Sequence, residues 1–130
     1  MEFPVISAGT ASVLALLQIF LALLVGFFRI KYKVGIGDSG HEKLARQVRV
    51  HGNLIENAPI FIILLTFLEL SGGSQTFLLS LAGVFIFARI SHAIALSQTS
   101  NPFAPLRAIG AFGSTFASLL CAGSILRQIL

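Results

Sequence analysis

The stretch from Phe3 to Phe28 contains no Asp, Glu, Lys or Arg. A helix needs about 20 consecutive apolar residues to cross the hydrocarbon core of a bilayer, so this stretch is long enough to span a membrane. No basic residue precedes it, and it is longer than the apolar core of a signal peptide. We therefore predict a first transmembrane helix over residues 3–28.

The composition of the whole chain favours the same environment. Hydrophobic residues make up 55% of the 130 residues and charged residues only 11%, whereas a soluble domain carries about 25% charged residues. Such a chain cannot cover a surface that faces water, so we predict an integral membrane protein with a single domain over residues 1–130. Its one cysteine, Cys121, excludes an intrachain disulfide, and we expect it to be a small buried hydrophobe.

Three polar segments divide the rest of the chain. They contain Asp38-Ser-Gly40, the turn Ser71-Gly-Gly-Ser74, and a loop with Pro102 and Pro105, and residues of these types break helices. We predict further helices over residues 42–70, 75–96 and 106–127, of which the first two are antiparallel neighbours across a tight turn. The expected fold class is all-α, an integral membrane four-helix bundle.

The basic residues indicate how this bundle is oriented. Six of the nine Lys and Arg residues lie close together in the sequence: Arg29, Lys31, Lys33, Lys43, Arg46 and Arg49. Because cytoplasmic loops of membrane proteins are enriched in Lys and Arg, we expect this end at the cytoplasmic face and both termini in the periplasm. Topology explains the positive charge, so no nucleic-acid partner is expected.

Polar residues that a membrane span rarely contains gather at this same end. They are Arg29, Arg46, Arg49, His51, Asn53, Glu56, Arg89, His92 and Arg107. Charged groups in a membrane must be compensated, and the carboxylate of Glu56 cannot balance so many guanidinium groups. We therefore expect a small anionic ligand that also carries an ammonium or amide group, since arginine pairs with carboxylates and Glu56 would accept an amine. Alternatively, Glu56 neutralises Arg49 or Arg89 and only locks the helices together. No metal site is expected.

Two motifs carry a resemblance to a known family. Arg49-x-x-x-Asn53-x-x-Glu56-x-x-Pro59 resembles the second-helix signature of the MAPEG family, the membrane-associated proteins of eicosanoid and glutathione metabolism. Phe87-Ala-Arg89-Ile-Ser-His92 resembles the third-helix motif of that family, and Arg107 opens the fourth helix in a similar way. The resemblance extends over the whole chain and is greatest for the small bacterial branch.

This resemblance implies a homotrimer in the bacterial inner membrane, with glutathione as co-substrate in sites between neighbouring subunits near the cytoplasmic face. It implies that Arg49, Asn53 and Glu56 hold the peptide and that Arg107 stabilises its thiolate. The remaining residues expected near glutathione are Arg29, His51, Arg89 and His92. His51 points about 160° away from Arg49 around the helix, which independently favours a site shared by two subunits.

The implied activity is that of a membrane glutathione transferase or peroxidase. Glutathione would be activated as a thiolate, the reactive form of a thiol, and presented to a lipophilic electrophile or hydroperoxide that arrives through the membrane lipids. Asn57 and Leu96 stand where several family enzymes have tyrosine, so activation of the thiol would depend on Arg107. The alternative is a non-catalytic anion- or thiol-binding membrane protein, or a small transporter, that uses the same basic pocket.

Overall fold

A computed structural model describes residues 3–101 and 103–130 as four long helices. Their bounds are α1 Val5–Tyr32, α2 Glu42–Leu70, α3 Gln75–Gln98 and α4 Pro105–Ile129. All four are long and apolar enough to cross a membrane. The predicted all-α membrane bundle is therefore confirmed.

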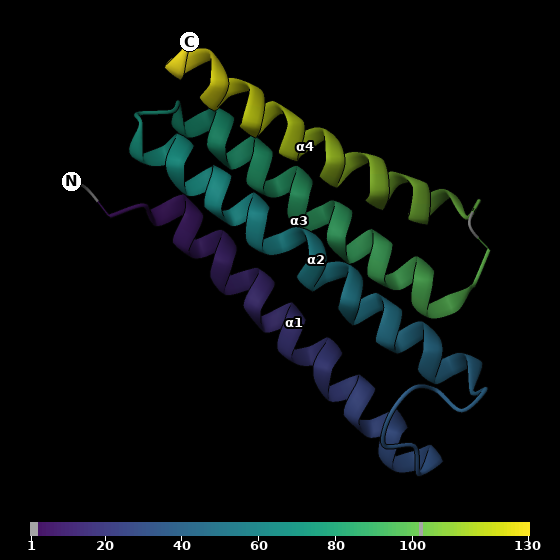
Figure 1. Ribbon diagram of the computed structural model, residues 1–130. Helices are drawn as coiled ribbons and strands as arrows, with labels where there is room; N and C mark the ends of the chain where they lie inside the picture. Colours follow the sequence, from purple (N-terminus) through teal and green to yellow (C-terminus); the bar gives the residue numbers. More distant parts are fainter. Residues whose placement is uncertain (1–2, 102) are drawn as a thin grey trace.

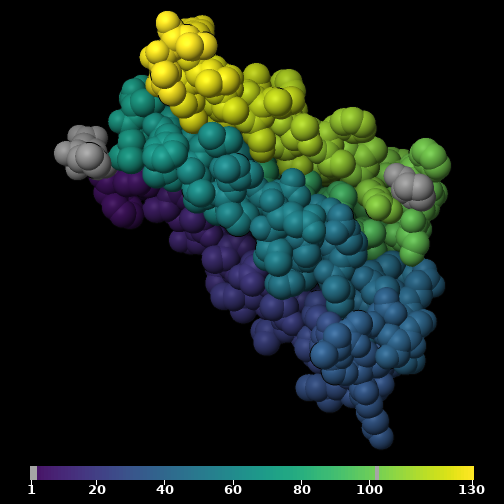
Figure 2. Space-filling model, viewed as in Figure 1, coloured from purple at the N-terminus to yellow at the C-terminus, as the bar shows by residue number. Residues whose placement is uncertain are grey.

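Each helix lies beside its neighbour in sequence, in the spatial order α1, α2, α3, α4 (Figure 1). α3 is the most buried of the four and contacts the other three, whereas α1 and α4 make no contact with each other in the described part of the chain. The start of α1, the turn between α2 and α3, and the end of α4 lie at one end of the bundle (Figure 1). The opposite end carries the other two loops, and the α1–α2 loop projects from it (Figure 2).

The core is built where α2 and α3 meet. The rings of Phe61 and Phe85 are fully buried and stack with their centroids 3.8 Å apart. Leu14 and Leu65, also buried, belong to the same cluster. Many other large apolar side chains, including Phe20 and Phe112, are exposed, and a surface of this kind requires lipid or a neighbouring subunit to cover it.

α1 extends beyond its predicted end at residue 28. It continues through Arg29 and Lys31 to Tyr32, and Lys33 then takes a left-handed conformation with φ 58°. Positive charge in the last turn interacts favourably with the carbonyl end of a helix, so the first charges end the apolar span without ending the helix. The α1–α2 loop is closed by stacking of the Tyr32 ring on the His41 ring, with centroids 4.2 Å apart.

The start of α1 is bound by the end of α2. The carboxylate of Glu69 accepts hydrogen bonds from the backbone N–H groups of Ile6 and Ser7, at 2.9 and 2.7 Å, and from the Ser7 hydroxyl at 2.6 Å. The first N–H groups of a helix have no partner within the helix. Glu69 therefore supplies from α2 the cap that α1 lacks in its own sequence.

Candidate functional site

Arg49 and Glu56 form an ion pair on the outer side of α2. The Nη1 atom of Arg49 lies 3.0 Å from Oε1 of Glu56, and the two side chains remain 58% and 52% exposed. Both line a cavity of about 400 Å³ whose other wall includes Gly37 and Asp38 of the α1–α2 loop. A ligand entering this cavity would meet two groups side by side: a guanidinium that can bind a carboxylate and a carboxylate that can bind an ammonium group.

Arg29 acts on the loop that forms this second wall. Its Nη1 atom donates to the backbone carbonyls of Gly35, at 2.9 Å, and Gly37, at 3.2 Å. The guanidinium thus ties the end of α1 to the loop beside Asp38. In this arrangement Arg29 contributes to the cavity by holding its wall in place.

Arg89 lies in the interior of the bundle and is only 4% exposed. Its Nη1 atom donates to Oδ1 of Asn53 at 2.9 Å, and its Nη2 atom donates to the carbonyl of Gly110 at 2.7 Å and to the hydroxyl of Ser114. These partners come from α2 and α4, so one side chain of α3 joins three helices. Asn53 is further held by the amide of Asn57, which donates to the Asn53 carbonyl at 2.8 Å.

His92 and Arg107 lie where α3 and α4 meet near the loop that connects them. Nδ1 of buried His92 is 3.4 Å from the carbonyl oxygen of Arg107, and Nε2 has no partner within the described residues. The guanidinium of Arg107 reaches the carbonyl of Ser100 at 3.4 Å. This weak contact leaves the Arg107 side chain available to a ligand.

His51 faces a different part of the bundle from Arg49. Its Nε2 atom lies 3.3 Å from Nε2 of Gln18, in the seam between α1 and α2. Arg46, which starts the polar stripe on α2, pairs with Glu42 at 2.5 Å, and the Ser100 hydroxyl donates to the same carboxylate oxygen at 2.8 Å. Arg46 thus joins a contact between the start of α2 and the α3–α4 loop.

The structure therefore divides the predicted site residues into separate groups. Asn53 and Arg89 are brought into direct contact, as are Arg49 and Glu56, while His51 lies on another side of α2. Gly110 and Ser114 were not identified from the sequence, although small residues on a membrane helix are a signal for close helix contact. No group of three or more His, Cys, Asp or Glu side chains in residues 3–101 and 103–130 is arranged to hold a metal ion.

Comparison with known families settles which class of membrane bundle this is. The model of the MAPEG family matches residues 7–127, a range that contains all the predicted site residues. The chain belongs to the MAPEG family. The family assignment that the two motifs suggested is thus confirmed.

This MAPEG protein is also similar to curated bacterial proteins. It is 35% identical over 88 residues to the inner membrane protein YecN of Escherichia coli strain K12, and equally to the protein of that name from strain O6:H1. The aligned stretch covers 67% of this chain and 66% of the relative, so it spans just under two thirds of the relative's length. The name of these relatives gives a location and no reaction.

Proposed function

We propose that this MAPEG protein is a glutathione transferase or glutathione peroxidase of a bacterial inner membrane. It would bind glutathione near the cytoplasmic face and stabilise its thiolate for attack on a lipophilic electrophile or hydroperoxide from the bilayer. Membership of the MAPEG family and the location named for the YecN proteins support this proposal. Both termini would lie in the periplasm, because the basic residues concentrate at the other end.

The observation that carries the proposal is the exposed pair of Arg49 and Glu56. Glutathione has two carboxylates and one ammonium group, and this pair offers a guanidinium and a carboxylate within 3.0 Å of each other beside a cavity of about 400 Å³. Because both side chains are half-exposed, the ion pair can open, and each side chain can then pair with an oppositely charged group of the ligand. Charge-assisted hydrogen bonds of this kind are stronger than neutral ones.

Arg107 is the residue proposed to act on the sulfur. A fixed positive charge next to a thiol favours the thiolate, and no tyrosine lies at Asn57 or Leu96 to share this task. Its guanidinium makes one long hydrogen bond, at 3.4 Å, in the described part of the chain. Thiolate formation would therefore depend on Arg107 while the peptide is held by α2.

A titration of the purified protein with glutathione, followed by the ultraviolet absorbance of the thiolate, tests this assignment. The unsubstituted protein should show the thiolate signal on binding, and Arg107→Ala should lose that signal while it still binds glutathione by calorimetry. Arg127→Ala removes the same charge at the other end of α4 and should leave the signal unchanged. Binding of glutathione by the unsubstituted protein without a thiolate signal would contradict the enzyme proposal and favour a non-catalytic binding protein.

A second measurement distinguishes a transporter from a transferase. Proton-coupled transport in proteoliposomes that needs no glutathione, and that Glu56→Gln abolishes, would favour a small transporter. Conversion of a lipophilic electrophile by the same proteoliposomes only when glutathione is present would favour the transferase.

A further inference from the structure

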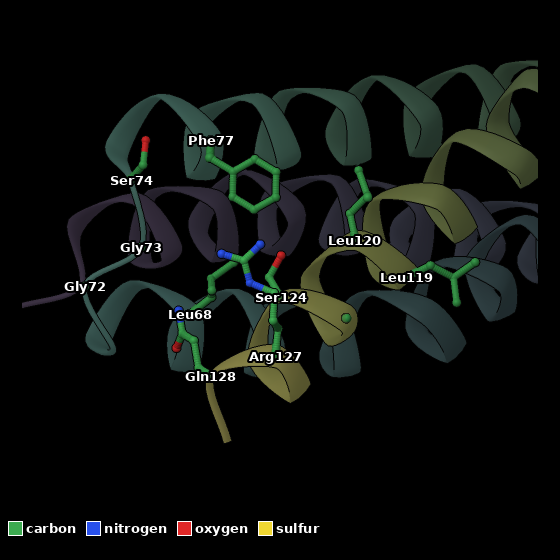
Figure 3. A pocket seen from close by; sticks show the side chains of 11 residues that line it. Leu68, Gly72, Gly73, Ser74, Phe77, Leu119, Leu120, Ser124, Arg127 and Gln128 are labelled. Atoms are coloured by element: carbon green, nitrogen blue, oxygen red, sulfur yellow. The ribbon is translucent and has the colours of Figure 1, made fainter. Parts of the chain in front are cut away.

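A larger cavity lies at the end of the bundle away from Arg49 and Glu56. It has a volume of about 540 Å³, within the range of about 300–1,000 Å³ typical of sites for small molecules. It is open on one side and is lined by the turn between α2 and α3 and by the last turns of α4 (Figure 3). None of the residues predicted to bind glutathione lines it.

One wall of this cavity is apolar and continues onto the outer surface of the bundle. Phe77 lies on one side of it, and Leu119 and Leu120 lie on the other. Leu119 is 66% exposed and Phe116, one turn earlier on α4, is 60% exposed. A hydrocarbon chain in contact with this wall could therefore extend along α4 into the surrounding lipid.

The other wall carries a positive charge. Arg127 extends from the last turn of α4 toward the α2–α3 turn, with Ser124 and Gln128 beside it (Figure 3). Within the described part of the chain Arg127 forms no ion pair, and the side chains of Ser124 and Gln128 form no hydrogen bond. A guanidinium, a hydroxyl and an amide thus remain available as donors next to an apolar wall.

From this combination we infer that the cavity is a binding site for an anionic phospholipid. The lipid phosphate pairs with Arg127 and accepts hydrogen bonds from Ser124 and Gln128, and one acyl chain lies against Leu119 and Leu120. Arginine near the end of a membrane helix reaches the level of the headgroups, where anionic lipids attract basic side chains. The site is independent of the glutathione proposal and of which face of the membrane this end occupies.

A lipid fits the charge of this cavity better than a second copy of the chain does. In a cyclic homotrimer the three-fold axis is normal to the membrane and all subunits have the same orientation, so a partner would present residues from this same end of the bundle. Glu69 is the one acidic residue that the structure describes at this end, and three donors of α1 already occupy its carboxylate. A neighbouring copy therefore offers Arg127 no free side-chain carboxylate among the described residues, whereas an anionic lipid offers a phosphate.

A tryptophan reporter tests the site directly, because the chain contains no tryptophan. Leu120→Trp places one fluorophore in the wall of the cavity, at a position that is 38% exposed. The protein is reconstituted in phosphatidylcholine vesicles that contain an equal small fraction of either brominated phosphatidylglycerol or brominated phosphatidylcholine. Bromine quenches the tryptophan only where the lipid is in contact, so the relative affinity of the cavity for the two lipids is measured.

We expect a preference for phosphatidylglycerol of about five-fold, the size expected for one basic residue at a membrane surface. Arg127→Gln should remove this preference, and Arg127→Lys should keep most of it. Lys33→Gln, which removes one charge at the opposite end, should have no effect. Equal quenching by the two lipids, or a preference that survives Arg127→Gln, would overturn the assignment.

A salt titration keeps the test decisive if Arg127→Gln fails to fold. High salt screens an exposed charge pair, so the preference of the Leu120→Trp protein for phosphatidylglycerol should decline as salt is raised. A preference that does not change with salt would mean that Arg127 is not its source, and the lipid site would be rejected. Loss of this preference would leave the glutathione titration unaffected, so the two proposals fail separately.

Discussion

At the scale of single residues, Arg89 and Arg49 illustrate two different roles for arginine in a membrane bundle. Arg89 is almost completely buried and gives its terminal nitrogens to Asn53, Gly110 and Ser114. Arg49 pairs with Glu56 and stays half-exposed. The first arrangement holds helices together and orients Asn53, whereas the second leaves charges that a ligand can reach.

Replacing Arg89 should therefore reduce stability severely. Arg89→Ala removes the guanidinium that donates to the Asn53 side-chain oxygen and to the Gly110 carbonyl, which then keeps only the Ser114 hydroxyl as a side-chain donor. Losing one partner of a buried polar network costs about 3 kcal/mol or more. The free energy of unfolding in detergent, measured by denaturant titration, checks this. Arg107→Ala is the matched control, and its loss should be below about 1 kcal/mol because its hydrogen bond is exposed. Equal losses for the two variants would contradict a structural role for Arg89.

Replacing Glu56 should weaken ligand binding and leave stability nearly unchanged. Glu56→Gln keeps the shape of the side chain but removes the charge that would hold the ammonium group of glutathione, so we expect binding to weaken about tenfold. Stability should change by less than about 1 kcal/mol, since an exposed ion pair contributes little. Calorimetric titration and denaturant unfolding of the same sample measure the two quantities. Unchanged affinity with a large loss of stability would support the alternative that Glu56 only locks the bundle.

At the scale of elements, the contact between α3 and α4 positions both Arg89 and Arg107. A Cβ atom added to Gly110 would lie 2.5 Å from Cβ of His92 and 2.7 Å from the carbonyl oxygen of Ala88. Only glycine permits this approach, and small residues at helix contacts are typical of membrane bundles. The Gly110 carbonyl reaches Arg89 because the two backbones are this close.

Gly110→Ala should accordingly force α3 and α4 apart. Overpacking of a close contact costs about 1–3 kcal/mol, and the shift would also weaken the hydrogen bond from Arg89 to Gly110. Gly123→Ala is the control on the same helix, because a Cβ there would meet nothing within 4 Å, and it should be neutral or stabilising by up to about 1 kcal/mol. The melting temperatures of both variants, measured by thermal unfolding, test this prediction. Equal changes in melting temperature would show that the close contact at Gly110 does not contribute to stability.

The same elements show what could and could not be predicted from the sequence. The first helix followed from a long uncharged stretch and the other three from breaks rich in polar residues, Gly and Pro, and the range expected for α2 is the one observed. The end of α1 was placed too early, because the apolar span ends at Phe28 while the helix continues to Tyr32. The positions of Asn53 and Arg89 along the predicted helices placed both at one end of the bundle. Their hydrogen bond, and that of Arg89 to Gly110, depend on how separate helices pack, which no local pattern encodes.

At the scale of the whole molecule, the polar residues of one chain do not form one pocket. Arg49 and Glu56 lie on the outer side of α2, while His51 contacts Gln18 in the seam with α1. In the described part of the chain no hydrogen bond or ion pair joins Arg107 to Arg49 or Glu56. Large exposed apolar surfaces remain on α1 and α4. These features are expected if the chain forms the homotrimer that we propose from its resemblance to the MAPEG family, with each ligand site completed by a neighbouring subunit.

Mixed oligomers test this directly. At a glutathione concentration that half-saturates the unsubstituted protein, Arg107→Ala should abolish formation of bound thiolate. Glu56→Gln, with an affinity about tenfold weaker, should reduce it to about a fifth. If one subunit supplies Glu56 and its neighbour supplies Arg107, co-expression of the two variants in equal amounts should restore about a quarter of the sites, because each site draws its two residues independently from a cyclic oligomer. The thiolate absorbance of the purified mixture, compared with that of the two variants purified separately and then combined, measures the recovery. A site built within one subunit would give no recovery in either sample, and would contradict the shared arrangement that the division of residues around α2 supports.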